Sequence, residues 1–315
     1  MAAKTGLRRV GIPLAVVVGI SAIGAGVYPA LAGERGPELP TVGVDELMVR
    51  ILESETEQLS GTIRVRSGFD VPGVSELARS LGGPAGHLAG LATGNNTLRI
   101  AVDGPERQRL VIAEGDEELS VFHVEGEVWM YDGSSNTAYH AALPREEWNE
   151  TLEEYEHRER SGPQEELGGL TPQEAAQRLL EEAGEHAEIT VDGTVRVAGR
   201  EAYELLIVPT GEEARAAAGD TPMGTVESVR IAVDAETGVP LAFTLEGTDR
   251  PLLDIAFSRI SYEKPAGGSF DFTPPENAEI VELNEPGALE GFSLPGLLGG
   301  GMFAEDDFEH EFSEG

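Results

Sequence analysis

The chain has 315 residues, of which 40% are hydrophobic and 6% aromatic, which suits one large domain with an aliphatic core. Acidic residues number 57 against 22 basic ones, and the formal net charge of -35 excludes nucleic acid as a partner because such a surface repels phosphates. The absence of cysteine excludes disulfides, thiol chemistry, Cys-based metal sites and a cysteine-acylated anchor.

The N-terminus predicts export from the cytoplasm. Lys4, Arg8 and Arg9 precede a charge-free apolar stretch at 10–27, and an A-x-A pattern ends at Ala32. A positive start, an apolar stretch and small residues before a cleavage site are typical of a secretory signal, so residues 1–32 are predicted to be one. The alternative is an uncleaved membrane anchor, because the apolar stretch is near the lower limit for a span. Either segment places the body of the protein outside the cytoplasm.

Hydrophobic periodicity then predicts the elements in chain order. Residues 33–43 are a Gly/Pro linker, and apolar residues at helical spacing predict a helix over 44–58. Period-two alternation predicts a first block of strands at 59–66, 97–102, 109–113, 119–124, 127–132 and 136–141. A second block is predicted at 188–191, 195–197, 203–207, 229–233, 241–245 and 253–262, with Asp192-Gly193 as a hairpin turn.

Three segments interrupt this rhythm. An apolar, Gly-rich insertion at 69–94 is longer than a hairpin needs and is predicted to be a lid, with Leu77, Leu81, Leu88 and Leu91 as its apolar residues. A second insertion at 144–185 begins with a charged stretch and ends in a helix over 171–185, where Thr171 and Glu174 form a capping box. The acidic tail, residues 283–315, is predicted to be disordered.

Catalytic motifs are missing from the sequence. No G-x-S-x-G, P-loop or G-x-G-x-x-G occurs, so the chain is not predicted to be an enzyme and no cofactor is expected. The histidines lack the spacing of metal ligands, although His123 and His140 could be neighbours across a hairpin. No metal site is predicted.

What remains is apolar surface on a curled sheet or barrel, for which a filled β-sandwich is the alternative. If such a sheet is not closed, helices, a lid or a ligand must cover its apolar side. A 16-carbon chain would gain on the order of 10 kcal/mol from burial before losses, which suffices for affinity without specific polar contacts. The residues leave two outcomes open: an open groove for an acyl chain, or a cavity filled by the side chains of the two helices.

Four segments resemble the LolA-like lipoprotein-carrier superfamily. Residues 121–132 are similar to its paired strands ending in W-x-Y-(N/D), and residues 270–275 to its closing F-x-F-x-P-P motif. Residues 231–240 resemble a late hairpin with a D-x-x-(T/D)-G turn, and residues 58–63 resemble the opening strand. The order of the motifs over 44–282 resembles an actinobacterial member of this superfamily, which includes the N-terminal domain of the RseB/MucB regulators.

The resemblance implies a half-open antiparallel β-barrel of about eleven strands, with helices and a lid on the concave side, over residues 44–282. The arginine that ties the lid shut in LolA corresponds to Gly104 here, before Pro105, so the resemblance does not supply that latch. The insertion at 69–94 and the acidic tail are also departures from the compact carrier.

The function implied is binding of a lipid or an acylated lipoprotein by a secreted or cell-envelope monomer. The alternative is a sensor-regulator of an envelope-stress sigma-factor pathway, with a membrane regulatory partner. The residues predicted to line the apolar concave face are Ile63, Val65, Leu98, Ile100, Leu110, Ile112, Trp129, Tyr131, Val229, Ile231, Leu241, Phe243, Leu245, Ile255 and Phe257.

Overall fold

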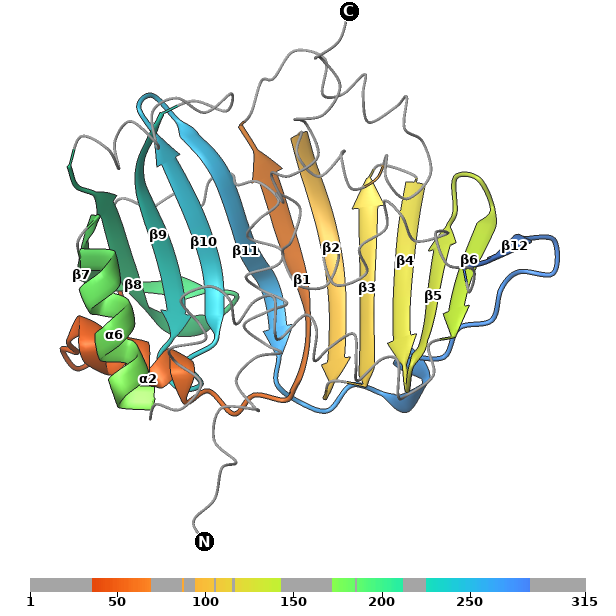
Figure 1. Ribbon diagram of the computed structural model, residues 1–315, viewed down its shortest axis with the longest axis horizontal. Coiled ribbons are helices and arrows are strands. Elements are labelled where there is room, and N and C mark those ends of the chain that lie inside the picture. Colours follow the sequence, from red (N-terminus) through yellow and green to blue (C-terminus); the bar gives the residue numbers. More distant parts are fainter. Residues whose placement is uncertain are drawn as a thin grey trace, which may run out of the picture.

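The computed structural model describes residues 36–68, 87, 94–104, 106–114, 117–142, 172–184, 186–211 and 225–283. In this part of the chain 12 strands form one sheet, in the order β12-β6-β5-β4-β3-β2-β1-β11-β10-β9-β8-β7 (Figure 1). Strands β12 and β7 form its two edges and do not pair with each other, so the sheet is open. The mostly β, half-open fold expected from the sequence is confirmed, and the alternative of two packed sheets is wrong for the described residues.

The strands of the first half are β1 (Gln58–Ser67), β2 (Gly94–Asp103), β3 (Arg107–Glu114), β4 (Glu117–Val124), β5 (Glu127–Asp132) and β6 (Thr137–Ala142). Those of the second half are β7 (Ala187–Val197), β8 (Arg200–Pro209), β9 (Val226–Asp234), β10 (Pro240–Gly247), β11 (Pro251–Ser261) and β12 (Glu279–Glu282). Most lie within a few residues of the bounds that alternation predicted, because side chains alternate between an apolar and a more polar side of the sheet.

The predicted hairpin at Asp192-Gly193 is wrong. Residues 187–197 form the single strand β7, and its register with β8 shifts between Val191 and Thr194. Gly193 has a φ of 115°, so the Asp-Gly pair forms a β-bulge in place of a turn. The chain reverses later, at Ala198 and Gly199, which both have positive φ. A glycine with positive φ serves either role, and only the pairing partner decides which.

The structure has a last strand, β12, that was not predicted. Strand β12 runs parallel to β6, whereas all other neighbouring strands are antiparallel. The chain leaves β11, passes along one end of the sheet, shown in blue at the bottom of Figure 1, and reaches β12 at the far edge. This long crossover is what permits parallel pairing, which a short hairpin connection cannot produce.

Helix α2 (Val44–Leu52) packs on one face of the sheet near its β7 edge. Leu47 and Ile51 lie one turn apart and are buried against Tyr203, Leu205 and Val233. The prediction continued the helix to residue 58, but Gln58 is the first residue of β1 and pairs with Asp103 of β2.

Helix α6 (Pro172–Gly184) agrees with the helix predicted over 171–185 and begins with proline, which is favourable at the first helical position. It contacts α2 and β7, and the two helices lie together at this end of the sheet in Figure 1. No helix in the described residues is long and apolar enough to cross a membrane.

Part of the predicted linker packs against the sheet. The Thr194 hydroxyl donates a hydrogen bond of 2.8 Å to the Pro37 carbonyl, and the Tyr203 hydroxyl donates one of 3.0 Å to the Pro40 carbonyl. Several predictions fall outside the described residues: the signal or anchor at 1–32, the lid residues Leu77, Leu81, Leu88 and Leu91, residues 144–171 of the second insertion, and residues 284–315 of the tail.

Candidate functional site

The sheet has two faces of opposite character. We call the face that carries α2 the helix face, and the other the opposite face. Cross-strand pairing places Leu205, Ile231, Phe243, Ile255 and Val65 in one row on the helix face, from β8 to β1. A second row continues the same face from β11 to β4 through Phe257, Ile63, Leu98, Ile112 and Leu119. The helix face is therefore continuously apolar across most of the sheet.

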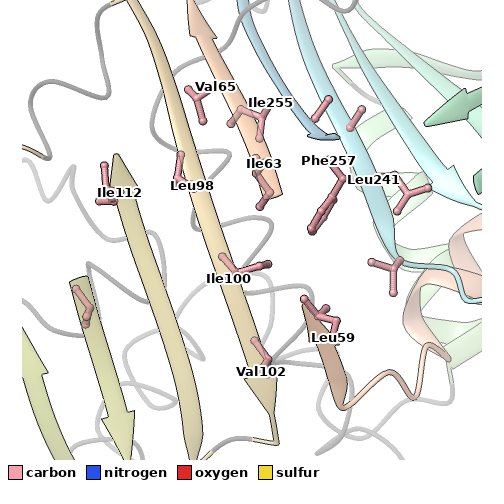
Figure 2. Close-up of a cluster of buried hydrophobic side chains, with 14 of the residues drawn as sticks. Leu59, Ile63, Val65, Leu98, Ile100, Val102, Ile112, Leu241, Ile255 and Phe257 are labelled. Carbon is pink, nitrogen blue, oxygen red and sulfur yellow. The ribbon is translucent and has the colours of Figure 1, made fainter. Parts of the chain in front are cut away.

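Figure 2 shows part of this face, where Val65, Ile255, Phe257, Ile63, Leu98 and Ile112 gather over β1, β2, β3 and β11. Of the fifteen residues predicted to line the apolar face, thirteen lie on the helix face. Eight are buried, namely Ile63, Val65, Leu98, Ile100, Ile112, Leu241, Ile255 and Phe257. Five are half-buried, namely Leu110, Val229, Ile231, Phe243 and Leu245.

Four of the half-buried residues form a compact patch. Val229 is opposite Leu245, and Ile231 is opposite Phe243, on the paired strands β9 and β10. We call these four residues the β9–β10 patch. Ile207 on β8 lies opposite Val229 and extends it. Among the described residues, this patch keeps apolar surface on the helix face that is only half-buried.

Trp129 and Tyr131 are the two exceptions, and placing them on the apolar concave face was wrong. Strand β5 carries apolar side chains in both directions, and Val128 and Met130 take the helix face. Trp129 therefore faces the other way, opposite Phe122 and His140. Because alternation alone cannot choose between two apolar sides, the sequence left this orientation undecided.

Several helix-face residues escaped the prediction although the signal was present. Leu59, Leu119, Val121, Val128, Met130 and Leu253 are buried in the same cluster. They continue the same period-two positions, so following the alternation along the whole of β1 and β11 and onto β4 and β5 would have found them.

The helix face also has a few buried polar groups at β5. Asp132 is 0% exposed; it accepts hydrogen bonds from the Ser134 N–H at 2.8 Å and from the hydroxyls of Ser134 at 2.7 Å and Ser135 at 2.9 Å. Burial opposes ionisation, but these hydrogen bonds outweigh it and hold the pKa of Asp132 below its ordinary value. His87 Nε2 lies 3.2 Å from Asp132 Oδ1, so this described residue of the 69–94 insertion is buried beside β5.

His123 and His140 are not neighbours, contrary to the prediction. His123 is paired with Val128 and shares the helix face, where desolvation lowers the pKa of its imidazole. His140 stacks on Trp129 on the opposite face, with ring centroids 4.0 Å apart. In the part of the chain that the structure describes, no three His, Cys, Asp or Glu side chains are placed to hold a metal ion.

The opposite face is covered at β3–β6 by the segment that follows β11. The Phe272 ring stacks on Phe122 at 4.8 Å and contacts Trp129 and Tyr131 at 5.7 and 5.8 Å. Arg109 donates a hydrogen bond to the Ser269 carbonyl. The F-x-F-x-P-P motif is thus a structural strap on the side of the sheet away from the apolar face.

No family model matches the chain, and no curated protein matches it. Solved structures of similar fold include MucB, at 15% identity with a TM-score of 0.40, covering 76% of this chain and 65% of that chain. They also include the LolA superfamily protein NE2245 from Nitrosomonas europaea, at 8% identity with a TM-score of 0.24, covering 74% of this chain and 99% of that one. A third is a putative outer membrane lipoprotein-sorting protein domain from Vibrio parahaemolyticus, at 9% identity with a TM-score of 0.25, covering 73% and 96%.

These structures carry names from the group that the sequence motifs resemble. At such identities and TM-scores the likeness concerns the arrangement of strands and does not identify a ligand. The chain spans 65% of the length of the MucB chain.

Proposed function

We propose that this protein binds an acyl chain or another lipid on the helix face of its open sheet, outside the cytoplasm, as a carrier and not as an enzyme. The observation that supports this most is the β9–β10 patch. Its four apolar side chains are half-buried within a continuous apolar face, next to residues of the same face that are already buried. A hydrocarbon guest would complete this burial without needing a polar partner.

The energetics are sufficient for such a role. Each buried methylene contributes about 0.8 kcal/mol, so a chain of about ten methylenes lying on the patch would gain about 8 kcal/mol before the costs of association. The patch itself gains as well, because its own side chains leave water. The four residues of the patch are all apolar and none is charged, which favours an alkyl chain over a polar ligand.

The proposal is tested by mass spectrometry of the purified protein for copurified lipid, together with titration of a fluorescent fatty-acid probe. Val229→Asn places an amide on the helix face within the patch and should weaken probe binding about tenfold, because roughly 1.4 kcal/mol of apolar contact is lost. Ser228→Asn is the matched control, since the neighbouring residue of β9 points to the opposite face and should change binding less than about twofold. Absence of both copurified lipid and saturable probe binding would refute the proposal.

The sequence resemblance also gives a second candidate function, which is a regulatory role with a membrane partner. One of the similar solved structures is that of MucB in complex with MucA(peri). Binding of MucA(peri) is a property of MucB. Capture of a membrane anti-sigma protein by the full chain would favour the regulator. Lipid binding with no such capture would favour the carrier.

A further inference from the structure

The opposite face of the central strands exposes a group of arginines. Thr62 on β1 pairs with Arg259 of β11 on one side and with Arg99 of β2 on the other. Two strand spacings separate the backbones of these arginines by about 10 Å, and Arg64 lies about 7 Å further along β1 on the same face. Arg64, Arg99 and Arg259 are all exposed, and we call them the arginine patch.

The charges of this patch are only partly neutralised. Arg99 has an ion pair of 3.3 Å with Glu118, and both side chains are largely exposed. Within the described ranges, Arg64 and Arg259 have no ion pair. A concentration of unpaired guanidinium groups is unusual in a chain with a formal net charge of -35, where acids outnumber bases 57 to 22. Guanidinium groups present planar donors that fit carboxylates in pairs.

We propose that the arginine patch is a docking surface for the acidic end of this same chain, residues 305–314. This segment has Glu305, Asp306, Asp307, Glu309, Glu311 and Glu314 and no lysine or arginine. Its charge is complementary to the patch, and its carboxylates are the groups that guanidinium binds best. The inference is independent of lipid binding on the helix face.

The length of the chain permits this contact. The last described residue, Leu283, is hydrogen-bonded to the His140 carbonyl beside β6. In the sheet order five strands follow β6 up to β1, and at about 4.8 Å per strand the gap is about 24 Å. The 21 residues between Leu283 and Glu305 let the chain span up to about 75 Å from Leu283 to Glu305 when extended. A tether longer than the gap holds its end at an effective concentration on the order of millimolar, which a separate acidic partner must exceed.

The net charge of the body does not prevent docking. At physiological ionic strength the Debye length is about 8 Å, so distant acids are largely screened while guanidinium groups in contact are not. Each exposed pair contributes little by itself, but several pairs formed in one chain act together. The contact should therefore be reversible and sensitive to salt.

The chain has no cysteine, so two engineered cysteines can be labelled without background. Asn95 is exposed on β2 and pairs with Arg66, on the same face as the patch. We would label Asn95→Cys and Ser313→Cys in the full chain with a fluorescent donor and acceptor. Energy transfer should be high at about 0.1 M ionic strength and fall about twofold or more at about 1 M, where the Debye length is about 3 Å.

The double substitution Arg64→Gln/Arg259→Gln should cause the same fall at low salt. The control Arg196→Gln/Arg250→Gln removes two exposed arginines outside the patch and should leave the transfer unchanged. Energy transfer that changes neither with salt nor with the patch substitutions overturns the proposal. So does transfer that appears only between separately labelled molecules, or patch-dependent binding to phosphatidylglycerol vesicles with no change in transfer, because the occupant is then a second copy or a membrane.

Discussion

Asp254 is a buried acid whose neighbours do not fully compensate its charge. It lies on β11 on the opposite face, 3% exposed, and the nearest cation, Arg66 Nη1, is 3.7 Å from its Oδ2. Its Oδ1 has no hydrogen-bond partner. Burial raises the pKa of Asp254 from 3.8 to about 7, and the attraction of Arg66 and Arg64 offsets only part of this effect.

This shift makes folding stability depend on pH in a defined direction. Below pH 3.8 Asp254 is protonated in both the folded and the unfolded chain, and no free energy is lost. Between 3.8 and about 7 the folded state binds the proton that the unfolded state releases, so stability falls as the pH rises. The whole interval corresponds to about 4 kcal/mol, an upper value because the buried site can relax.

Asp254→Asn keeps the size of the side chain but removes the charge. The variant should equal the wild type in free energy of unfolding near pH 4 and exceed it by about 2–4 kcal/mol at pH 8, since it no longer holds an uncompensated carboxylate. Urea unfolding at both pH values measures this difference directly. Asp249→Asn, at an exposed turn position, is the control and should give parallel profiles. A variant less stable than the wild type at pH 8 would refute the reasoning, because the ion pair with Arg66 would then outweigh burial.

Three further substitutions test other contacts. Phe272→Ala should cost about 3 kcal/mol and shift the fluorescence emission of Trp129, because the ring that covers this indole is removed. Arg200→Met should cost about 3 kcal/mol of unfolding free energy at pH 7, because Asp234 is 0% exposed and loses hydrogen bonds of 2.7 and 3.1 Å. Since the pKa of Asp234 in the folded state is lowered, this cost should shrink as the pH falls through that pKa. Gly61→Ala should cost about 1–3 kcal/mol in urea unfolding, because an added Cβ lies 2.7 Å from both a ring carbon and a backbone oxygen of β11.

Each of these has a control in the chain. Thr273→Ala changes the exposed neighbour of Phe272 and should leave the fluorescence unchanged. Arg196→Met removes an arginine whose side chain is 62% exposed and should cost little at any pH. Gly267→Ala adds a Cβ with nothing within 4 Å and should be neutral. A control as costly as its test variant would contradict the assigned contact.

Much of the fold and most of the candidate site could be predicted from local sequence patterns. Alternating residues identified the strands, and helical spacing identified α2 and α6, because each pattern is set by residues a few positions apart. Where one side of a strand was apolar and the other polar, the face was also predictable, as for Ile63 and Val65 on β1 with Arg64 between them. The thirteen residues of the helix face follow from this rule.

The tertiary structure decided the features for which local pattern offers two answers. Trp129 had apolar neighbours on both sides of its strand, Gly193 suited a bulge as well as a turn, and the parallel pairing of β12 depended on a crossover. The burial of Asp254 and the contact of Phe257 with Gly61 likewise arise between residues far apart in the chain. The sequence by itself determined which segments are strands and which sides are apolar, since period and polarity are local. Only the structure decided which strands meet and what covers each face, because those choices depend on the free energy of the whole packed sheet.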